Sequence, residues 1–269
     1  MDKKIPEPDK LYLESLVATL TGWNDPEARL TRAFEEDEFI LFGQPIVPLD
    51  PKSDLPPRVE VLIRLREEER NLTPPGAFIP FLEYFDMMPL LDRWVIGHAL
   101  DWWRSTGNAQ KPVLSVNLSA ITLGEPGFPE YVGRLLVDRK APGQALCFEL
   151  AHGDLTADPA LYSKAARQLK SLGCSFAVTG LGSDSVSFQT LRTIPASLVK
   201  IDGAIIREIH RDKLALAKAT SLRLVCRKLG IHSVAEFVEL PETRRLLQEI
   251  GVDYAQGYGI AKPAPLKQG

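Results

Sequence analysis

Eight short apolar segments alternate along this chain with longer segments of helical pattern. The apolar segments are residues 38–47, 59–65, 112–119, 145–151, 175–181, 197–202, 232–238 and 254–260. From the third segment onward, most of the gaps between them hold amphipathic helical patterns. Because repeated strand and helix units build parallel sheets, and eight such units close on themselves, the sequence predicts an α/β fold of the TIM (β/α)8 barrel type.

Start and stop signals mark individual helices and one exception to the parallel order. Asp158-Pro159 opens a helix that closes at Gly173, and Pro241-Glu242 opens one that closes at Gly251. The first two strands are joined only by residues 48–57, which are rich in proline and too short for a crossover helix. This pair is therefore expected to be an antiparallel hairpin, which makes the barrel a modified one.

The N-terminal region has a helical pattern of its own. Apolar residues recur at helical spacing over residues 10–36, which predicts helices that lead into the barrel. We therefore divide the chain into an N-terminal helical lead-in, residues 1–34, and a barrel domain, residues 35–269. A barrel of about 250 residues is commonly one domain, and the 269 residues here fit that size.

Composition excludes several classes of partner. The net charge of −3 provides no basic stripe for a nucleic-acid backbone, so no polynucleotide partner is expected. The first residues lack the apolar core of a signal peptide, and no run of ~18 apolar residues occurs, so neither a leader nor a membrane span is expected and the chain is predicted to be cytoplasmic. Cys147, Cys174 and Cys226 lack metal-site spacing and are predicted to be buried, inert thiols.

Polar residues recur at the ends of the predicted strands, where the loops of such barrels assemble active sites. They are Asn117, Glu149, Lys200, Asp202, Glu236 and Gln256, and Glu60 adds a further acid in the second strand. Any one of them could cap a helix or pair with an arginine instead. Several acids gathered on one face need cations or hydrogen-bond donors to meet them. Together these residues predict a site for a divalent metal and a phosphate.

One strand lacks such a residue. The segment 175–182 reads Ser-Phe-Ala-Val-Thr-Gly-Leu-Gly, so Thr179 and Gly180 stand where the architecture calls for acids. Neither a neutral hydroxyl nor a glycine replaces a carboxylate ligand, and the site is predicted to lack a central acid.

The motifs of the chain resemble those of one family. They are Gln44-Pro-Ile, Glu60-Val-Leu-Ile-Arg64, Phe78-Ile-Pro80, Arg93-Trp94-Val, Val116-Asn-Leu-Ser119, Phe148-Glu-Leu150, Lys200-Ile-Asp202, Val234-Ala-Glu236 with Glu239, and Gln256-Gly-Tyr258. In order and spacing, from about residue 35 to 265, this set resembles the EAL domain. The resemblance implies a modified eight-stranded barrel that hydrolyses cyclic di-GMP to its linear dinucleotide with two Mg²⁺ or Mn²⁺ ions.

The resemblance also implies roles for individual residues. Metal ligation falls to Glu60, Asn117, Glu149 and Glu236, whose oxygen donors suit Mg²⁺ or Mn²⁺. Lys200 is implied to hold the attacking water, with Asp202 beside the metals. The nucleotide contacts fall to Gln44, Leu62, Arg64 and Gln256, with Tyr258 added to that set.

Two departures from the family pattern bear on catalysis. The family's Asp-Asp-Phe-Gly, whose first aspartate bridges the metals, is Thr179-Gly-Leu-Gly182 here, and its Glu-Leu-Thr-Glu is Glu149-Leu-Ala-His152. Two cations ~3.5–4 Å apart need a shared carboxylate. We therefore expect at most one ion, weakly bound or absent. Asp184 and His152 could compensate, but Asp184 is better explained as the cap of a helix near residues 186–192.

Three functions follow from this pattern. The first is a catalytically impaired domain that acts as a cyclic di-GMP receptor or signalling effector, which the retained nucleotide-facing residues favour. Arg64 is its key residue, because a guanidinium pairs with phosphate without metal; the alternative is that Arg64 pairs with Glu60. The second is a protein-interaction module that has lost nucleotide binding, and the third is a residual phosphodiesterase.

The interaction module requires an apolar surface, and its partner is not named by the sequence. The candidates Phe81, Tyr84, Phe85, Met87 and Met88 form only a modest cluster and are interpreted mostly as core between helix and barrel. A homodimer is a further alternative, since the family's Asp-Asp-Phe-Gly loop helps to form one, although that loop is changed here.

Overall fold

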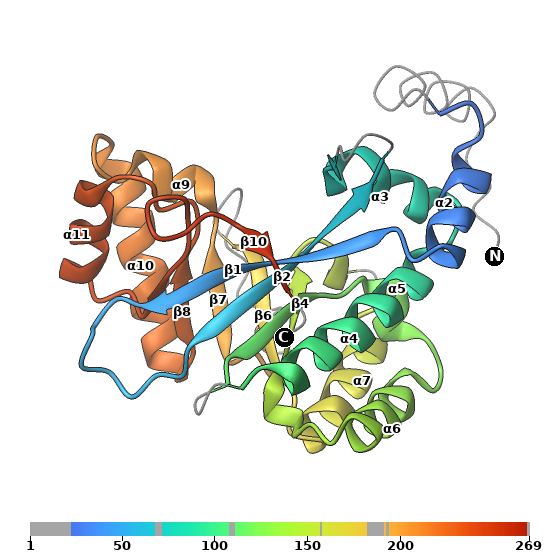
Figure 1. Ribbon diagram of the computed structural model, residues 1–269. Coiled ribbons are helices and arrows are strands. Elements are labelled where there is room, and N and C mark those ends of the chain that lie inside the picture. Colours follow the sequence, from blue (N-terminus) through green and yellow to red (C-terminus); the bar gives the residue numbers. More distant parts are fainter. Residues whose placement is uncertain are drawn as a thin grey trace.

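A closed barrel wrapped by helices forms the body of the molecule (Figure 1). The structure is a computed structural model that describes residues 23–67, 72–107, 111–156, 158–181, 191 and 194–267. The barrel strands are β1 (Phe39–Pro48), β2 (Arg58–Arg66), β4 (Val113–Asn117), β5 (Leu146–Ala151), β6 (Ser175–Leu181), β7 (Leu198–Ile201), β8 (His232–Ala235) and β9 (Tyr254–Ala255). The predicted fold class, a modified TIM barrel, is confirmed.

Strand β1 closes the barrel and is antiparallel to both of its neighbours in the barrel, β2 and β9. It pairs antiparallel with β2 from Phe39↔Leu65 to Ile46↔Arg58, and its end pairs antiparallel with β9 at Val47↔Ala255. The neighbouring strands from β2 round to β9 are parallel. The antiparallel hairpin predicted from the short proline-rich connection is therefore confirmed.

Two further strands extend the sheet beyond the barrel. They are β3 (Leu72–Thr73), which pairs with the end of β2, and β10 (Ala264–Pro265), which pairs with β1 at Phe42 and Gly43. Neither was predicted, because two residues are too few to show a period. Strand β10 and the residues after it cross β1 closely: a Cβ on Gly43 would meet the side chain of Leu266.

The helices cover the outside of the barrel, with helix α2 and helix α3 near its N-terminal strands (Figure 1). They are α2 (Pro26–Glu35), α3 (Pro75–Tyr84), α4 (Met88–Ser105), α5 (Ala120–Gly124), α6 (Phe128–Arg139), α7 (Pro159–Ser171), α9 (Gly203–Glu208), α10 (Lys213–Leu229) and α11 (Pro241–Glu249). The two helices predicted from Asp158 and Pro241 are α7 and α11. Asp158 caps α7 by accepting a hydrogen bond from the Leu161 amide.

The main core lies between the barrel and these helices. Leu30 of α2, Phe78 of α3 and Ile96 of α4 are fully buried in it with residues of β2, β4 and β5. Phe81, Met87 and Met88 are buried as well, which confirms their interpretation as core rather than surface. The three cysteines are buried free thiols, as predicted. Burial raises the pKa of Cys174 to about 12 and that of Cys226 to about 11.

Two predicted strands are too long. The segments 232–238 and 254–260 stay extended only over β8 (His232–Ala235) and β9 (Tyr254–Ala255). The reason lies in the backbone, because φ is 53° at Phe237 and 156° at Gly257, and neither value continues a strand. Glu236 and Gln256 therefore lie on loops directly after their strands.

Some predictions fall wholly or partly outside the described residues. Asp184 and most of the helix expected near 186–192 lie there, as do the first twenty-two residues of the expected lead-in. Helix α2 supplies the described part of that lead-in. Among the described residues, no helix is both long enough and apolar enough to cross a bilayer.

Candidate functional site

A pocket of about 390 Å³ lies over the carboxyl ends of the barrel strands. Its lining comes from β1, β2, α9 and the loops that follow β8 and β9, and consists of Gln44, Glu60, Leu62, Arg64, Arg207, Glu236, Phe237, Glu239, Gln256, Gly257, Tyr258 and Pro263. Seven of the sequence-predicted site residues, Gln44, Glu60, Leu62, Arg64, Glu236, Gln256 and Tyr258, are in this lining. The fold thus brings together residues that are up to about two hundred positions apart in the chain.

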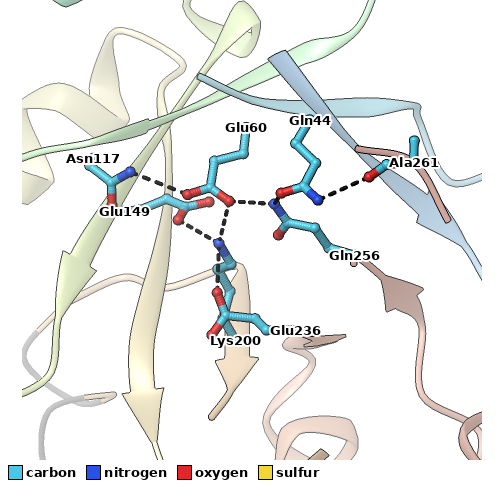
Figure 2. Close-up of polar contacts among 8 residues, drawn as sticks. All are labelled: Gln44, Glu60, Asn117, Glu149, Lys200, Glu236, Gln256 and Ala261. Carbon is cyan, nitrogen blue, oxygen red and sulfur yellow. Dashed lines mark hydrogen bonds and ion pairs between the residues drawn. The ribbon is translucent and has the colours of Figure 1, made fainter. Parts of the chain in front are cut away.

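Lys200 lies at the centre of the acidic residues beneath this pocket (Figure 2). Its Nζ is 2.8 Å from Glu149 Oε2, 3.0 Å from Glu60 Oε2 and 2.9 Å from Glu236 Oε1. Only 2% of the Lys200 side chain is exposed. Three carboxylates from three different strands or strand ends thus converge on one buried ammonium group, as expected if the acids are neutralised internally.

Amides extend the network from Glu60 to both sides (Figure 2). Asn117 Nδ2 donates to Glu60 Oε1 at 3.3 Å, and Gln256 Nε2 donates to Glu60 Oε2. Gln256 Nε2 also lies 3.0 Å from Gln44 Oε1, and Gln44 Nε2 donates to the Ala261 carbonyl at 3.0 Å. Each donor fixes the orientation of the next residue, so this part of the site is preorganised by the protein alone.

The electrostatics of the acids are set by burial and by Lys200. Burial opposes ionisation of Glu60, but Lys200 and the hydrogen bonds from Gln256 and Asn117 outweigh it and lower its pKa. Burial dominates at Glu149 and, despite Lys200, raises its pKa to about 7. Burial opposes the charge on Lys200, yet the three carboxylates hold its pKa well above its ordinary value. The carboxylates thus favour the charged form of Lys200, whereas burial favours the protonated form of Glu149.

The donor set includes buried oxygens of the kind that bind a divalent cation. Oε1 of Glu149 and Oε1 of Gln256 are buried without a hydrogen-bond partner, and the first is a carboxylate oxygen of the kind that Mg²⁺ binds. The carboxylates converge on Lys200, however, and the described residues contain no group of three acids, histidines or cysteines arranged around a common metal position. Binding of an ion therefore requires Glu60, Glu149 or Glu236 to turn away from the ammonium group.

Strand β6 supplies no acid to the site. Its pairing with β7 shifts between Val178 and Leu181, where three steps along β6 match the two steps from Val199 to Ile201. Gly180 lies in this bulge with φ 74°, a left-handed conformation that favours glycine. The carbonyl of Thr179 accepts a hydrogen bond from the His152 amide at 3.1 Å. The segment is thus a backbone irregularity rather than a strand end that carries a ligand.

Two predicted residues have partners outside the acidic network. Asp202 is the N-cap of α9, and its Oδ1 accepts a hydrogen bond from the Ala204 amide at 2.7 Å, so the structure shows the capping alternative. Arg64 donates to the Ile63 carbonyl at 2.7 Å, and its guanidinium lies 5.4 Å from the centre of the Phe42 ring. Within the described chain it forms no ion pair with Glu60, so the alternative of an Arg64–Glu60 pair is wrong.

Sequence reasoning missed three residues of the pocket lining, Arg207, Phe237 and Pro263. Arg207 on α9 lines it, with its guanidinium 4.6 Å from the centre of the Phe237 ring. Phe237 lies between Glu236 and Glu239, both of which belong to a motif quoted above, but Phe237 itself was not recognised as a pocket residue. The signal for Arg207 was its position five residues after Asp202, on the helix that Asp202 caps, which a search of strand ends alone does not reach.

A larger cavity, of about 490 Å³, lies at the opposite end of the barrel. It is lined by the segment after β1 and by Arg223, Gln248 and Asp253. Its polar groups bind one another: Asp253 accepts hydrogen bonds from the amide and hydroxyl of Ser233 and pairs with Arg223 at 3.5 Å. In barrels of this type the residues at this end serve stability, and the active site forms at the carboxyl end. We therefore place the site at the carboxyl end.

A family model for the EAL domain matches residues 27–263. The chain belongs to the EAL domain family. This EAL domain is 38% identical, over 88% of its length, to the cyclic di-GMP phosphodiesterase PdeB of Shewanella oneidensis, and 32% identical, over 88% of its length, to the cyclic di-GMP phosphodiesterase PdeF of Escherichia coli. It spans 28% and 32% of the lengths of those two proteins.

Solved structures of EAL domains have the same fold. The EAL domain of FimX from Pseudomonas aeruginosa bound to cyclic di-GMP superposes with a TM-score of 0.84, at 25% identity, over 91% of this chain and 99% of that one. A cyclic di-GMP complex of the PaMucR phosphodiesterase gives a TM-score of 0.82, at 26% identity, over 89% of this chain and 97% of that one. The closed barrel with one antiparallel strand is thus the architecture of the family.

Proposed function

We propose that this EAL domain is a receptor for cyclic di-GMP that binds the dinucleotide at the carboxyl end of its barrel and has lost efficient hydrolysis. The observation that carries the proposal is the position of Lys200, whose ammonium group pairs with Glu60, Glu149 and Glu236 and offsets part of their negative charge from within the protein. An ammonium group bound to all three acids competes with dications for the same carboxylate oxygens.

The absence of a carboxylate on β6 supports the same conclusion. Thr179 has only a hydroxyl group, and Gly180, in the bulge, has no side chain. Strand β6 therefore provides no carboxylate that could bridge two cations and offset their mutual repulsion. A bound Mg²⁺ or Mn²⁺ supplies Lewis-acid stabilisation of a phosphate oxygen. Glu60, Asn117, Glu149 and Glu236 would hold one such ion, with the unpartnered Oε1 of Glu149 among its ligands.

The nucleotide contacts do not depend on metal. Arg64 lines the pocket without an acidic partner among the described residues, and its fork of donors can meet a phosphate in two hydrogen bonds. Gln44 and Gln256 are held in place by their hydrogen bonds to each other, while Leu62 and Tyr258 give apolar area. Binding in the absence of Mg²⁺ follows from this set.

Residual hydrolysis is the second candidate. It is favoured by the 38% identity to PdeB of Shewanella oneidensis, which is a cyclic di-GMP phosphodiesterase. In that case one ion and Lys200 would position water, at a rate far below that of a two-metal site. A role as an interaction module has less support, since Phe81, Met87 and Met88 are buried. The cytoplasmic location and a homodimer stay predictions.

Calorimetric titration with cyclic di-GMP tests the proposal. In buffer with EDTA we expect binding, and 5 mM Mg²⁺ should change the affinity by less than about threefold. Arg64→Ala should weaken binding by about 2 kcal/mol, the scale of a lost charge-assisted contact. Arg245→Ala, on the exposed face of α11, is the matched control and should bind as the unaltered protein does. No measurable binding at high micromolar ligand would contradict the proposal.

A further inference from the structure

Residues 257–266, which we call the strap, lead from the end of β9 past the pocket to β1 (Figure 1). The strap begins with a turn, in which the Gly257 carbonyl accepts hydrogen bonds from the Ile260 and Ala261 amides at 3.0 Å each. It then contributes Pro263 to the pocket lining and pairs with β1 through the two residues of β10. Gly257 and Tyr258 line the pocket as well, so this short segment forms part of its wall.

The strap is held to β1 by hydrogen bonds at its surface. Gln44 Nε2 donates to the Ala261 carbonyl at 3.0 Å, and the Leu266 amide donates to the Leu41 carbonyl at 2.9 Å. Every residue from 258 to 266 is exposed or half-buried. A segment of this kind opens at a lower cost in free energy than the core does. The strap is therefore expected to open while the barrel stays folded.

Leu266 gives the strap an apolar anchor. Its side chain packs against the main core and lies over Gly43 of β1, where a Cβ would meet Leu266 Cδ2. The missing side chain of Gly43 thus leaves a notch that Leu266 fills. The next residue of β1 is Gln44, which binds Ala261 of the strap and faces Gln256 in the pocket. The notch therefore adjoins the point where the strap meets the pocket.

We propose that Leu266 is a positioning residue for the nucleotide, because its place in the notch holds the strap against the pocket. This inference rests on the proposed function, since it concerns binding in the same pocket. Tyr258 and Pro263 line the pocket when the strap is docked. A ligand that contacts the docked strap stabilises that state, and by linkage the docked strap raises the affinity for the ligand. Nucleotide binding and docking of Leu266 therefore stabilise one another.

Three variants test whether Leu266 acts through the strap. Leu266→Ala empties the notch, whereas Leu266→Met keeps an apolar side chain of similar volume. Leu229→Ala, at the exposed end of α10 and outside the pocket lining, is the matched control. Each protein is titrated with cyclic di-GMP in EDTA by calorimetry. Hydrogen exchange of the strap is followed by mass spectrometry with and without the nucleotide, and a peptide from α4 serves as the reference for the barrel.

In the unaltered protein, cyclic di-GMP should slow amide exchange in the strap by about fivefold or more, because the open strap lacks part of the pocket wall. Leu266→Ala should weaken binding by about fivefold or more, at the lower end of the range for coupled sites, and should speed exchange in the strap but not in α4. Leu266→Met and Leu229→Ala should bind within about threefold of the unaltered protein.

Two results would overturn the inference while the proposed function stands. One is exchange in the strap that is equally fast with and without bound nucleotide, and the other is Leu266→Ala that binds as tightly as the unaltered protein. If Leu266→Ala does not fold, exchange in the unaltered protein decides alone. If the unaltered protein does not bind cyclic di-GMP, the inference and the proposed function are both overturned.

Discussion

The ammonium nitrogen of Lys200 lies 2.8 Å from Oε2 of Glu149 inside the barrel, and 2% or less of either side chain is exposed. This pair joins β5 and β7, which are separated by β6, a strand that carries no acid. The protein therefore has its own cation at the position where its acids meet. The predictions below follow from that relationship.

Removal of the ammonium group should leave the acids unneutralised. We expect Lys200→Met to lower the free energy of unfolding by about 3–5 kcal/mol in EDTA, the range for breaking a buried ion pair. Added Mg²⁺ should restore part of that loss, because the three carboxylates then need a cation. Urea denaturation measures both effects. Lys228→Met, at an exposed position of α10, is the control, and an unchanged stability of Lys200→Met would contradict the assignment.

Stability should depend on pH through Glu149. Its pKa in the folded protein is about 7 against an ordinary value of 4.5, so the folded state holds a proton in this range that the unfolded state has released. The contribution to stability is therefore lost as the pH rises from about 4.5 to about 7, by on the order of 1–3 kcal/mol. Glu149→Gln should lack this loss when both proteins are unfolded in urea with a chelator at pH 5 and pH 8. If the free energy of unfolding changes equally with pH in Glu149→Gln and in the unaltered protein, the raised pKa of Glu149 is contradicted.

Metal occupancy should be low. A crystal grown in millimolar Mg²⁺ is expected to contain at most one ion, bound by oxygens from Glu60, Asn117, Glu149 or Glu236, because the internal cation competes for the same carboxylates. Anomalous scattering from Mn²⁺ in place of Mg²⁺ identifies the ion and its number. Two ordered ions at a separation of ~3.5–4 Å would contradict this expectation.

Restoring acids on β6 should succeed at one position and not at the other. Thr179→Asp places a carboxylate on the same face of the strand as Ala177, which packs in the barrel interior, and should raise the affinity for Mn²⁺ by about tenfold or more. Gly180→Asp puts a side chain at φ 74° and should lower the melting temperature. Calorimetry with Mn²⁺ and thermal unfolding check the pair. Equal metal affinity of Thr179→Asp and the unaltered protein would show that the missing acid is not what limits binding.

The barrel was predictable because its signals are local and repeated. Alternating apolar and helical segments gave the strand number, and the proline-rich residues 48–57 gave the antiparallel pair, since neither requires knowledge of distant contacts. The convergence of Glu149, Lys200 and Glu236 followed from the rule that parallel strands end on one face, whereas Glu60, near the start of β2, was assigned to the site by the resemblance of its motif.

The remaining features depend on backbone geometry and on long-range pairing. The positive φ of Phe237 ends the predicted strand 232–238 early, and no residue type in that segment indicates a positive φ. The bulge at Gly180 arises from the register between β6 and β7, which single strands do not encode. Asp202 had two interpretations in the sequence, and only the position of the Ala204 amide shows the cap.

An assay of cyclic di-GMP hydrolysis tests whether internal pairing of the acids and the missing carboxylate on β6 have removed efficient catalysis. Purified protein at micromolar concentration is incubated with cyclic di-GMP in 5 mM Mg²⁺ or Mn²⁺, and the linear dinucleotide is separated and quantified over time. The account predicts product formation indistinguishable from the enzyme-free control, while calorimetry of the same sample shows bound ligand. Turnover on the order of 1 s⁻¹, an ordinary enzyme rate, would contradict it.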